Sequence, residues 1–409
     1  MTHLWTFPNY RYLFSATAIS NLGDGVSALA FPWLATLITR DPFLVAFVGF
    51  ATRLPWLLLS IPAGVWTDRA DRRQLMIRAD LARLALTFGV IGIIFSVPDF
   101  PLADPLPYIF GLSALAFLLG CAEVLRDNAA QTVLPSVVPK DTLERANGQL
   151  WSIEQVMGSF VGPPLAGLLI AYAVPAPFVV DALTFGAAAM LVWAMRIPAR
   201  PCPPKRSWRQ DAREGFSWLW RNALILRLAI MLGLMNLLSM MTLAVLPLFV
   251  QDLWGLNAAQ HGLLLTAGAA GGVAGGLLCP GIAARTGERA ALLIALPAMA
   301  CAMAMIAVAP SIWWVAIGLF VEMFAALLWN IVTVSYRQRH IPDALLGRVN
   351  SLYRFFGWGM IPFGALLGGG LVAHTTSHLG SEIALRLPYV AATLGMVAIW
   401  IYGIARLRL

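Results

Sequence analysis

Apolar runs of about 20 residues recur along the whole sequence, with short polar segments between them. A helix rises about 1.5 Å per residue, so each run is long enough to cross roughly 30 Å of bilayer hydrocarbon. Only 12% of the 409 residues are charged, whereas soluble domains carry about 25%. Too few polar side chains remain to cover a soluble particle of this size, and the chain is therefore predicted to be a membrane protein.

Twelve such runs predict an all-α membrane protein with twelve transmembrane helices. They cover residues 12–38, 43–66, 77–97, 106–133, 148–172, 177–196, 223–250, 259–283, 290–309, 311–336, 351–373 and 387–405. If these helices alternate in direction, all 28 Lys and Arg residues except Arg40, Arg53 and Arg386 fall on one side. Lys and Arg concentrate on the cytoplasmic side of membranes, so both termini are predicted to be cytoplasmic. The net charge of +8 then reflects topology, and no nucleic-acid partner is expected.

Several function classes lack their sequence signals. The four cysteines are scattered without CxxC spacing, so neither a disulfide framework nor a metal site is indicated. No phosphate-binding GK[ST] loop, HExxH or GxSxG pattern occurs. We therefore expect no cofactor, no direct use of ATP and no enzymatic activity.

The longest polar interval, residues 198–222, separates six apolar runs from six. Its start is rich in proline and predicts a linker, while its second part mixes aromatic and charged residues and predicts an amphipathic helix on the cytoplasmic face. The expected organisation is a six-helix bundle over 1–197, the linker, and a second bundle over 223–409.

The two halves share a repeated pattern. Residues Pro139–Asn147 and Pro342–Asn350 both read P-x3-L-x-R-x-N, and they follow the fourth and the tenth apolar runs. Duplicated six-helix halves are the architecture of alternating-access transporters. The repeat therefore predicts two pseudo-symmetric bundles.

The loop after the second run carries the most specific motif. It reads GVWTDRADRR from Gly64 to Arg73 and resembles the signature G-x-x-x-D-R-x-x-R-R/K of the major facilitator superfamily. The resemblance implies the twelve-helix fold of that family and a conformational latch between its halves. The latch residues would be Gly64, Asp68, Arg69, Arg72 and Arg73. The alternative is a basic cytoplasmic turn without a switching role.

The fifth run contains Gly158, Gly162 and Pro163. These residues resemble the exporter-associated motif G-x3-G-P-x2-G-G of the same superfamily, with Ala166 at one glycine position. The resemblance implies a bend typical of antiporters. The alternative is ordinary packing of small residues between helices.

Carboxylates at bilayer depth are candidates for proton coupling, because an ionisable group there is costly and by default functional. Asp24 lies near the middle of the first run, and Arg53 of the second run could reach it. Such a pair either binds and releases a proton or forms a permanent ion pair. A tight arginine partner would hold Asp24 ionised and make proton transfer harder.

Glu322 in the tenth run has no obvious basic neighbour in the sequence and is the second coupling candidate, for a proton or a cationic substrate. Asn21 and Asn236 are candidates for lining a cavity. Asp181 lies near the outer end of the sixth run, where water or a helix cap would satisfy it.

A group of charges is predicted at the cytoplasmic third of the fourth and fifth runs. Glu123, Arg126 and Asp127 share a helix face through their spacing, and Glu154 lies at a similar depth. We expect these four residues to form a structural or gating cluster with Asp68 rather than to contact substrate.

Two further stretches resemble the enterobactin-exporter and macrolide-efflux branch of the superfamily. They are Asn21–Asp24 and Arg126–Pro135, the latter continuing to Leu143–Gly148. The resemblance implies export of drug- or siderophore-like molecules driven by inward proton flow.

We thus predict a monomeric, proton-coupled exporter of small amphiphilic molecules in the bacterial inner membrane, with a small-molecule substrate, protons and membrane lipids as its partners. A lipid or lysolipid flippase and a proton-coupled uptake symporter are the alternatives.

Overall fold

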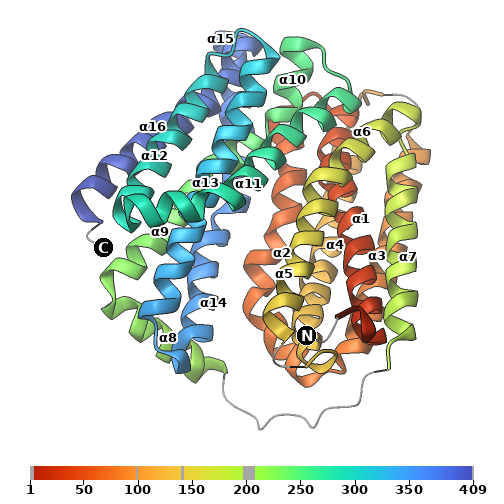
Figure 1. Cartoon of the computed structure of the whole chain (residues 1–409). Coiled ribbons are helices and arrows are strands. Elements are labelled where there is room, and N and C mark those ends of the chain that lie inside the picture. The colour runs from red at the N-terminus through yellow and green to blue at the C-terminus, as the bar shows by residue number, and fades with distance from the viewer. Residues whose placement is uncertain (1–3, 98–99, 140–141, 197–207, 408–409) are drawn as a thin grey trace. The chain divides into compact units, whose positions relative to one another are not determined.

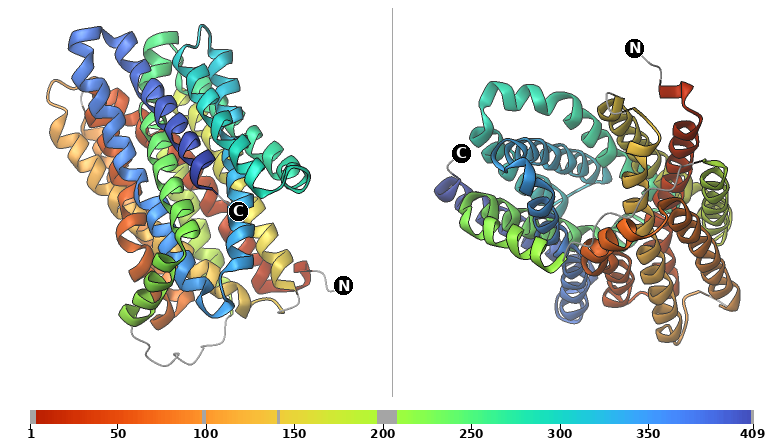
Figure 2. Two further views of the ribbon diagram at one scale, coloured as in Figure 1. Left: turned by 90° about the vertical axis from the view of Figure 1, so that its left-hand side faces the viewer. Right: turned by 90° about the horizontal axis from the view of Figure 1, so that it is seen from below.

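The computed structural model describes residues 4–97, 100–139, 142–196 and 208–407, and every element in these ranges is a helix (Figures 1 and 2). The elements are η1 (Leu4–Thr6), α1 (Pro8–Ile38), α2 (Pro42–Arg69), α3 (Arg72–Ser96), α4 (Leu106–Val133), η2 (Leu134–Ser136), α5 (Leu143–Gln155), η4 (Val156–Val161), α6 (Gly162–Tyr172), α7 (Ala176–Ala194), α8 (Trp208–Arg221), α9 (Ala223–Leu243), α10 (Leu246–Trp254), α11 (Ala258–Thr286), α12 (Glu288–Ala307), α13 (Ile312–His340), α14 (Asp343–Gly359), α15 (Ile361–Leu379) and α16 (Ser381–Arg406).

Within the described residues, 11 helical stretches are long and apolar enough to cross a membrane. The prediction of an all-α, multi-pass membrane protein is therefore confirmed. Helix α1 is not among the 11, although it is 31 residues long. The twelfth span and the side of the membrane on which the termini lie stay predictions.

The chain forms two compact units. The first comprises Met1–Thr39, Ala51–Lys205 and Asn257–Leu263. Its helices α1, α3, α4 and α7 pack against one another as the α3–α4, α1–α7 and α3–α7 pairs (Figure 1). A cluster of buried apolar residues that includes Leu13 and Met76 lies at the end of this unit where α1 begins.

The predicted fifth helix of the first unit is built from three segments. Its first part, α5, continues into the π-helix η4 and then into α6, with Pro163 in the first turn of α6. This segment approaches α1 backbone to backbone. A Cβ added to Gly25 would lie 2.4 Å from the carbonyl oxygen of Gly158, and one added to Gly162 would lie 2.5 Å from the Cα of Gly25. Glycine is required at these crossings because no side chain fits between the backbones.

The second unit comprises Arg40–Phe50, Arg206–Leu256 and Leu264–Leu409. It too depends on close glycine contacts. Cβ atoms added to Gly364 and Gly368 of α15 would lie 2.2 and 2.1 Å from carbonyl oxygens of α9. A large apolar core that includes Trp329 and Tyr353 fills the space among α9, α12, α13, α14 and α16.

Helix α8 covers the second part of the predicted linker, whereas residues 198–207 lie outside the described ranges. It packs on α14 of the second unit, where Glu214 forms an ion pair with Arg348. A Cβ on Gly215 would lie 3.1 Å from the Cβ of Arg348. Phe216 and Trp220, one helical turn apart, stack on each other and are exposed. Contact of α8 with lipid remains a prediction.

The crossing of α1 with η4 and α6 can be tested with Gly162→Ala. The added methyl group would meet the backbone of Gly25, which has no flexible end to move aside. We expect a loss of about 1–3 kcal/mol in the free energy of unfolding, measured by denaturant titration of the detergent-solubilised protein. Gly148→Ala is the matched control, because no heavy atom lies within 4 Å of its added Cβ. Equal stability of the two variants would contradict the crossing.

Candidate functional site

Arg83 is the centre of a buried charge network in the first unit. It lies on α3, and only 2% of its surface is exposed. The guanidinium forms an ion pair with Asp24 of α1, donates a hydrogen bond to the Ser20 hydroxyl at 3.1 Å, and lies 3.8 Å from the ring centroid of Phe185 on α7. One arginine thus joins three helices.

Asp80 lies one helical turn before Arg83 and is fully buried. One carboxylate oxygen is 3.8 Å from Arg83 and 3.7 Å from Arg126 of α4. Neither oxygen accepts a hydrogen bond from the described residues. A carboxylate buried this completely is held by charge alone, which makes it sensitive to any movement of the two arginines.

Arg126 is only 1% exposed and anchors the α4 side of the network. It donates a hydrogen bond to the Ala16 carbonyl of α1 at 3.1 Å and lies 3.5 Å from Asp127. Glu154 of α5 interacts electrostatically with Asp127 and Arg126. Glu123 also interacts electrostatically with Asp127, so these four members of the predicted gating cluster are neighbours.

Asp181 of α7 also belongs to the buried interior. It is fully buried and accepts a hydrogen bond from Ser27 of α1 at 2.6 Å. A Cβ on Gly23 would lie 2.4 Å from the other Asp181 oxygen, so the glycine of the Asn21–Asp24 stretch makes room for this carboxylate. The expectation that water or a helix cap satisfies Asp181 was wrong, because α7 turns this residue toward α1.

The expected pairing of Asp24 with Arg53 was also wrong. Asp24 pairs instead with Arg83 of α3. Arg53 is exposed, and its electrostatic neighbour is Glu123 of α4, which also accepts a hydrogen bond from the Trp56 side chain.

Carboxylates outnumber cations in this network. Arg83 and Arg126 are its buried cations among the described residues, and six carboxylates interact with them: Asp24, Asp80, Glu123, Asp127, Glu154 and Asp181. Several unpaired negative charges at low dielectric would cost several kcal/mol each. The described network therefore favours uptake of protons or of a cationic group.

The sequence reasoning missed Asp80 and assigned Arg83 and Arg126 to the cytoplasmic charges. All three lie near the predicted cytoplasmic ends of apolar runs, and the two arginines were therefore counted among the cytoplasmic positive charges. Their helical spacing was the available signal, since Asp80 and Arg83 are three residues apart and share one face of α3.

The second unit has a simpler polar site. Glu322 of α13 accepts a hydrogen bond from Ser239 of α9, and it lies close enough to Tyr389 of α16 to interact electrostatically. Within the described residues, no cation lies within ion-pair distance of Glu322. The cavity candidate Asn236 donates to the Gly357 carbonyl at 2.8 Å and so links α9 to α14. The other cavity candidate, Asn21, donates to the Thr17 carbonyl within α1.

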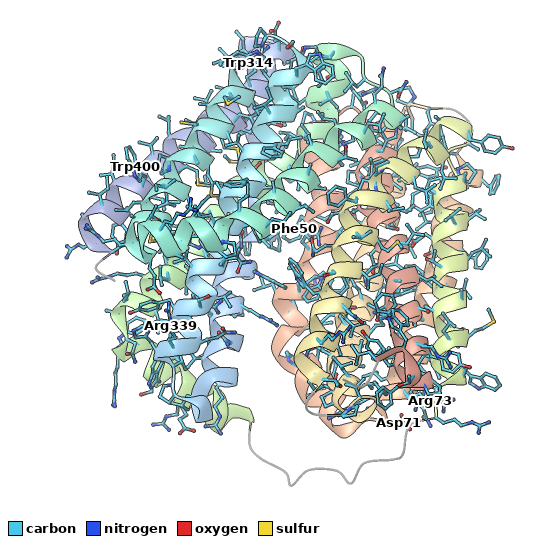
Figure 3. The ribbon with its side chains drawn as sticks, viewed as in Figure 1. Phe50, Asp71, Arg73, Trp314, Arg339 and Trp400 are labelled. Atoms are coloured by element: carbon cyan, nitrogen blue, oxygen red, sulfur yellow. The ribbon has the colours of Figure 1, made fainter. Side chains whose placement is uncertain are left out.

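The predicted latch lies at the end of α2 and the start of α3. The side chains of Gly64, Asp68 and Arg69 are outside what the structure describes. Arg72 donates to the Thr132 carbonyl of α4 at 2.8 Å, and Arg73 donates to two carbonyls at the end of α7. Figure 3 shows Arg73 beside Asp71 at this end of the first unit. The two described arginines therefore fix the loop to its own bundle.

Comparison with known proteins identifies the family. Residues 6–407 match the major facilitator family described as transmembrane secretion effector. The chain belongs to this family. It is a multi-pass transporter of the cytoplasmic membrane, as its sequence motifs predicted.

Relatives of known name include two kinds of efflux protein. The multidrug efflux pump Tap of Mycobacterium bovis is 28% identical over 98% of this chain and 95% of its own length. The enterobactin exporter EntS of Shigella boydii is 25% identical over 91% of this chain and 87% of its own length. The predicted resemblance to the enterobactin-exporter branch is confirmed.

Solved structures share the fold. The nucleoside transporter NupG superimposes with a TM-score of 0.81 at 11% identity, over 98% of this chain and 100% of its own. A bacterial homologue of the iron transporter ferroportin in an inward-facing state gives 0.73 at 16% identity, over 97% of this chain and 99% of its own. These similarities establish the transporter fold and say nothing about the cargo.

The charge network can be tested with Arg83→Gln. This change leaves Asp24 without its cation and Asp80 with Arg126 alone, and it is expected to cost roughly 3–5 kcal/mol in the free energy of unfolding. Adding Asp24→Asn removes one of the uncompensated charges and should recover part of that loss. Unfolding of the solubilised protein by denaturant provides the measurement. A double variant no more stable than Arg83→Gln alone would show that the ion pair is energetically unimportant.

Proposed function

We propose that this transporter exports small amphiphilic molecules, drug- or siderophore-like, in exchange for protons. The observation that carries the proposal is the excess of carboxylates over arginines around Arg83. A network of this composition can accept a proton from one side of the membrane and lose it to the other when its surroundings change. The efflux activities named for the relatives support the outward direction.

Asp24 is the proposed proton carrier. Its side chain is 22% exposed, whereas that of its partner Arg83 is 3% exposed. When Asp24 binds a proton, Arg83 loses that ion pair and retains Asp80, one turn away on the same helix. Asp80 is thus a second anionic partner for Arg83. Protonation of Asp24 therefore does not leave the buried guanidinium without a counter-charge.

Glu322 is the proposed second coupling site or the contact for a cationic group on the substrate. Its described partners are neutral hydroxyl groups, so no ion pair holds it in the charged form. A substrate ammonium and a proton would compete for the same carboxylate.

Alternating access requires two helical bundles that move against each other. Helix α1 would be the twelfth span, whose low hydropathy reflects the polar residues that it contributes to the network. Both termini would be cytoplasmic. The bundles 1–197 and 223–409 would rock about the linker 198–222, within a monomer. Gly158, Gly162 and Pro163 would provide the bend, and Gly64, Asp68 and Arg69 the latch.

Asp24→Asn tests the coupling role. In proteoliposomes with an imposed pH gradient, the variant is expected to bind a fluorescent cationic amphiphile but to lose gradient-driven transport, because the neutral amide cannot carry a proton. Glu322→Gln should weaken transport of cationic substrates more than that of neutral ones. Glu382→Gln is the matched control, because this carboxylate is 71% exposed at a helix end.

Gradient-driven transport that is unchanged in both Asp24→Asn and Glu322→Gln would overturn the coupling sites. Movement of labelled phospholipid without any dependence on the gradient would instead favour the flippase alternative. Accumulation of the amphiphile on the side opposite to that expected for export would favour uptake.

A further inference from the structure

A cavity of about 470 Å³ opens at the end of the first unit where α1 begins. Its lining comes from η1, α1, α5 and the start of η4, and includes Trp5, Phe14, Arg145, Gly148, Gln149 and Val156. This volume is in the range of small-molecule sites. None of the carboxylates of the charge network lines it, so it is separate from the site already described.

The cavity has a polar end and an apolar end. Arg145 and Gln149 supply the polar groups, and Gln149 is oriented by a 2.8 Å hydrogen bond from the Tyr10 hydroxyl. Phe14 and Val156 supply the apolar end, and Val156 is exposed. Trp5 packs edge-on against Phe14. An amphiphile with an anionic head and an apolar tail would match this order.

The repeated half shows what an arginine at this position binds. Arg145 and Arg348 occupy the same place in the P-x3-L-x-R-x-N repeat. Arg348 forms an ion pair with Glu214 of α8, and Gly215 packs closely on Arg348 and Leu352. By the same repeat offset, Leu352 corresponds to Gln149, which lines the cavity.

The first unit has no counterpart of α8 in its described residues. Before α9 stands a helix of 14 residues, whereas before α1 stands η1 with only three. Among the described side chains, no carboxylate lies within ion-pair distance of Arg145. The cavity therefore lies beside Arg145 and Gln149, which correspond in the repeat to the two residues that α8 contacts in the second unit, Arg348 and Leu352.

We propose that this cavity binds one anionic phospholipid of the cytoplasmic leaflet. The lipid phosphate would accept hydrogen bonds from Arg145, just as the Glu214 carboxylate pairs with Arg348 in the second unit. An acyl chain would lie along Phe14 and Val156. Three observations select a phospholipid: the arginine at a predicted membrane interface, the exposed Trp5 that lines the same cavity, and the exposed Val156 at its apolar end. The lipid would pack against η1 and α5, as α8 packs against α14.

Native mass spectrometry of the full-length protein tests the proposal, with phosphatidylglycerol or phosphatidylcholine of the same chains added to the detergent. The wild type should retain one phosphatidylglycerol that phosphatidylcholine does not replace. Arg145→Gln should lower that occupancy about tenfold, as expected for loss of a hydrogen bond between charged groups. Gly148→Leu should also lower it, by filling the cavity while Arg145 remains.

Gly148→Leu is expected to fold, because no heavy atom lies within 4 Å of a Cβ at this position and leucine favours a helix over glycine. Arg213→Gln on α8 removes an exposed charge elsewhere and should leave the bound lipid unchanged. Equal retention of the two lipids by the wild type would overturn the proposal. So would full occupancy in Gly148→Leu, or an equal loss in Arg213→Gln, which would indicate attraction by surface charge alone.

Discussion

The burial of two arginine side chains inside a helix bundle is the constraint on which the first unit depends. Arg83 and Arg126 are almost completely shielded, and an unpaired guanidinium there would cost several kcal/mol. Carboxylates from α1, α3, α4 and α7 surround them. The packing of four helices is thereby tied to the ionisation of a few acidic groups, and any event that changes one charge changes the forces between helices.

Glycine contacts make this network possible. Backbones that meet at Gly25 and Gly162 bring α1 against η4 and α6, and Gly23 lets Asp181 approach α1. Short-range polar interactions need such close approach, since ion pairs weaken with distance and lipid offers no hydrophobic drive between helices. The π-helix η4 lies at the same crossing, where a locally loosened turn is typical of functional sites.

The two halves share a repeat but differ in chemistry. The first unit contains a charged network, whereas the second has an isolated Glu322 with hydroxyl neighbours. The arginine of the repeat also differs between the units. Arg348 forms an ion pair with Glu214 of α8, whereas Arg145 lines a cavity. The two units thus share the repeated sequence pattern, while the polar and charged side chains around it differ.

The sequence by itself determined the membrane class, the apolar spans and the transporter family, because these depend on run length, composition and local motifs that need no partner. It also located Asp24 and Glu322, since a carboxylate within an apolar run is visible without a structure. Only the tertiary structure decided that Asp24 pairs with Arg83 instead of Arg53, that Asp181 is buried, and that Asp80 lies between two arginines. Each of these outcomes depends on how one helix is rotated against another, and the apolar runs are too uniform to encode that rotation.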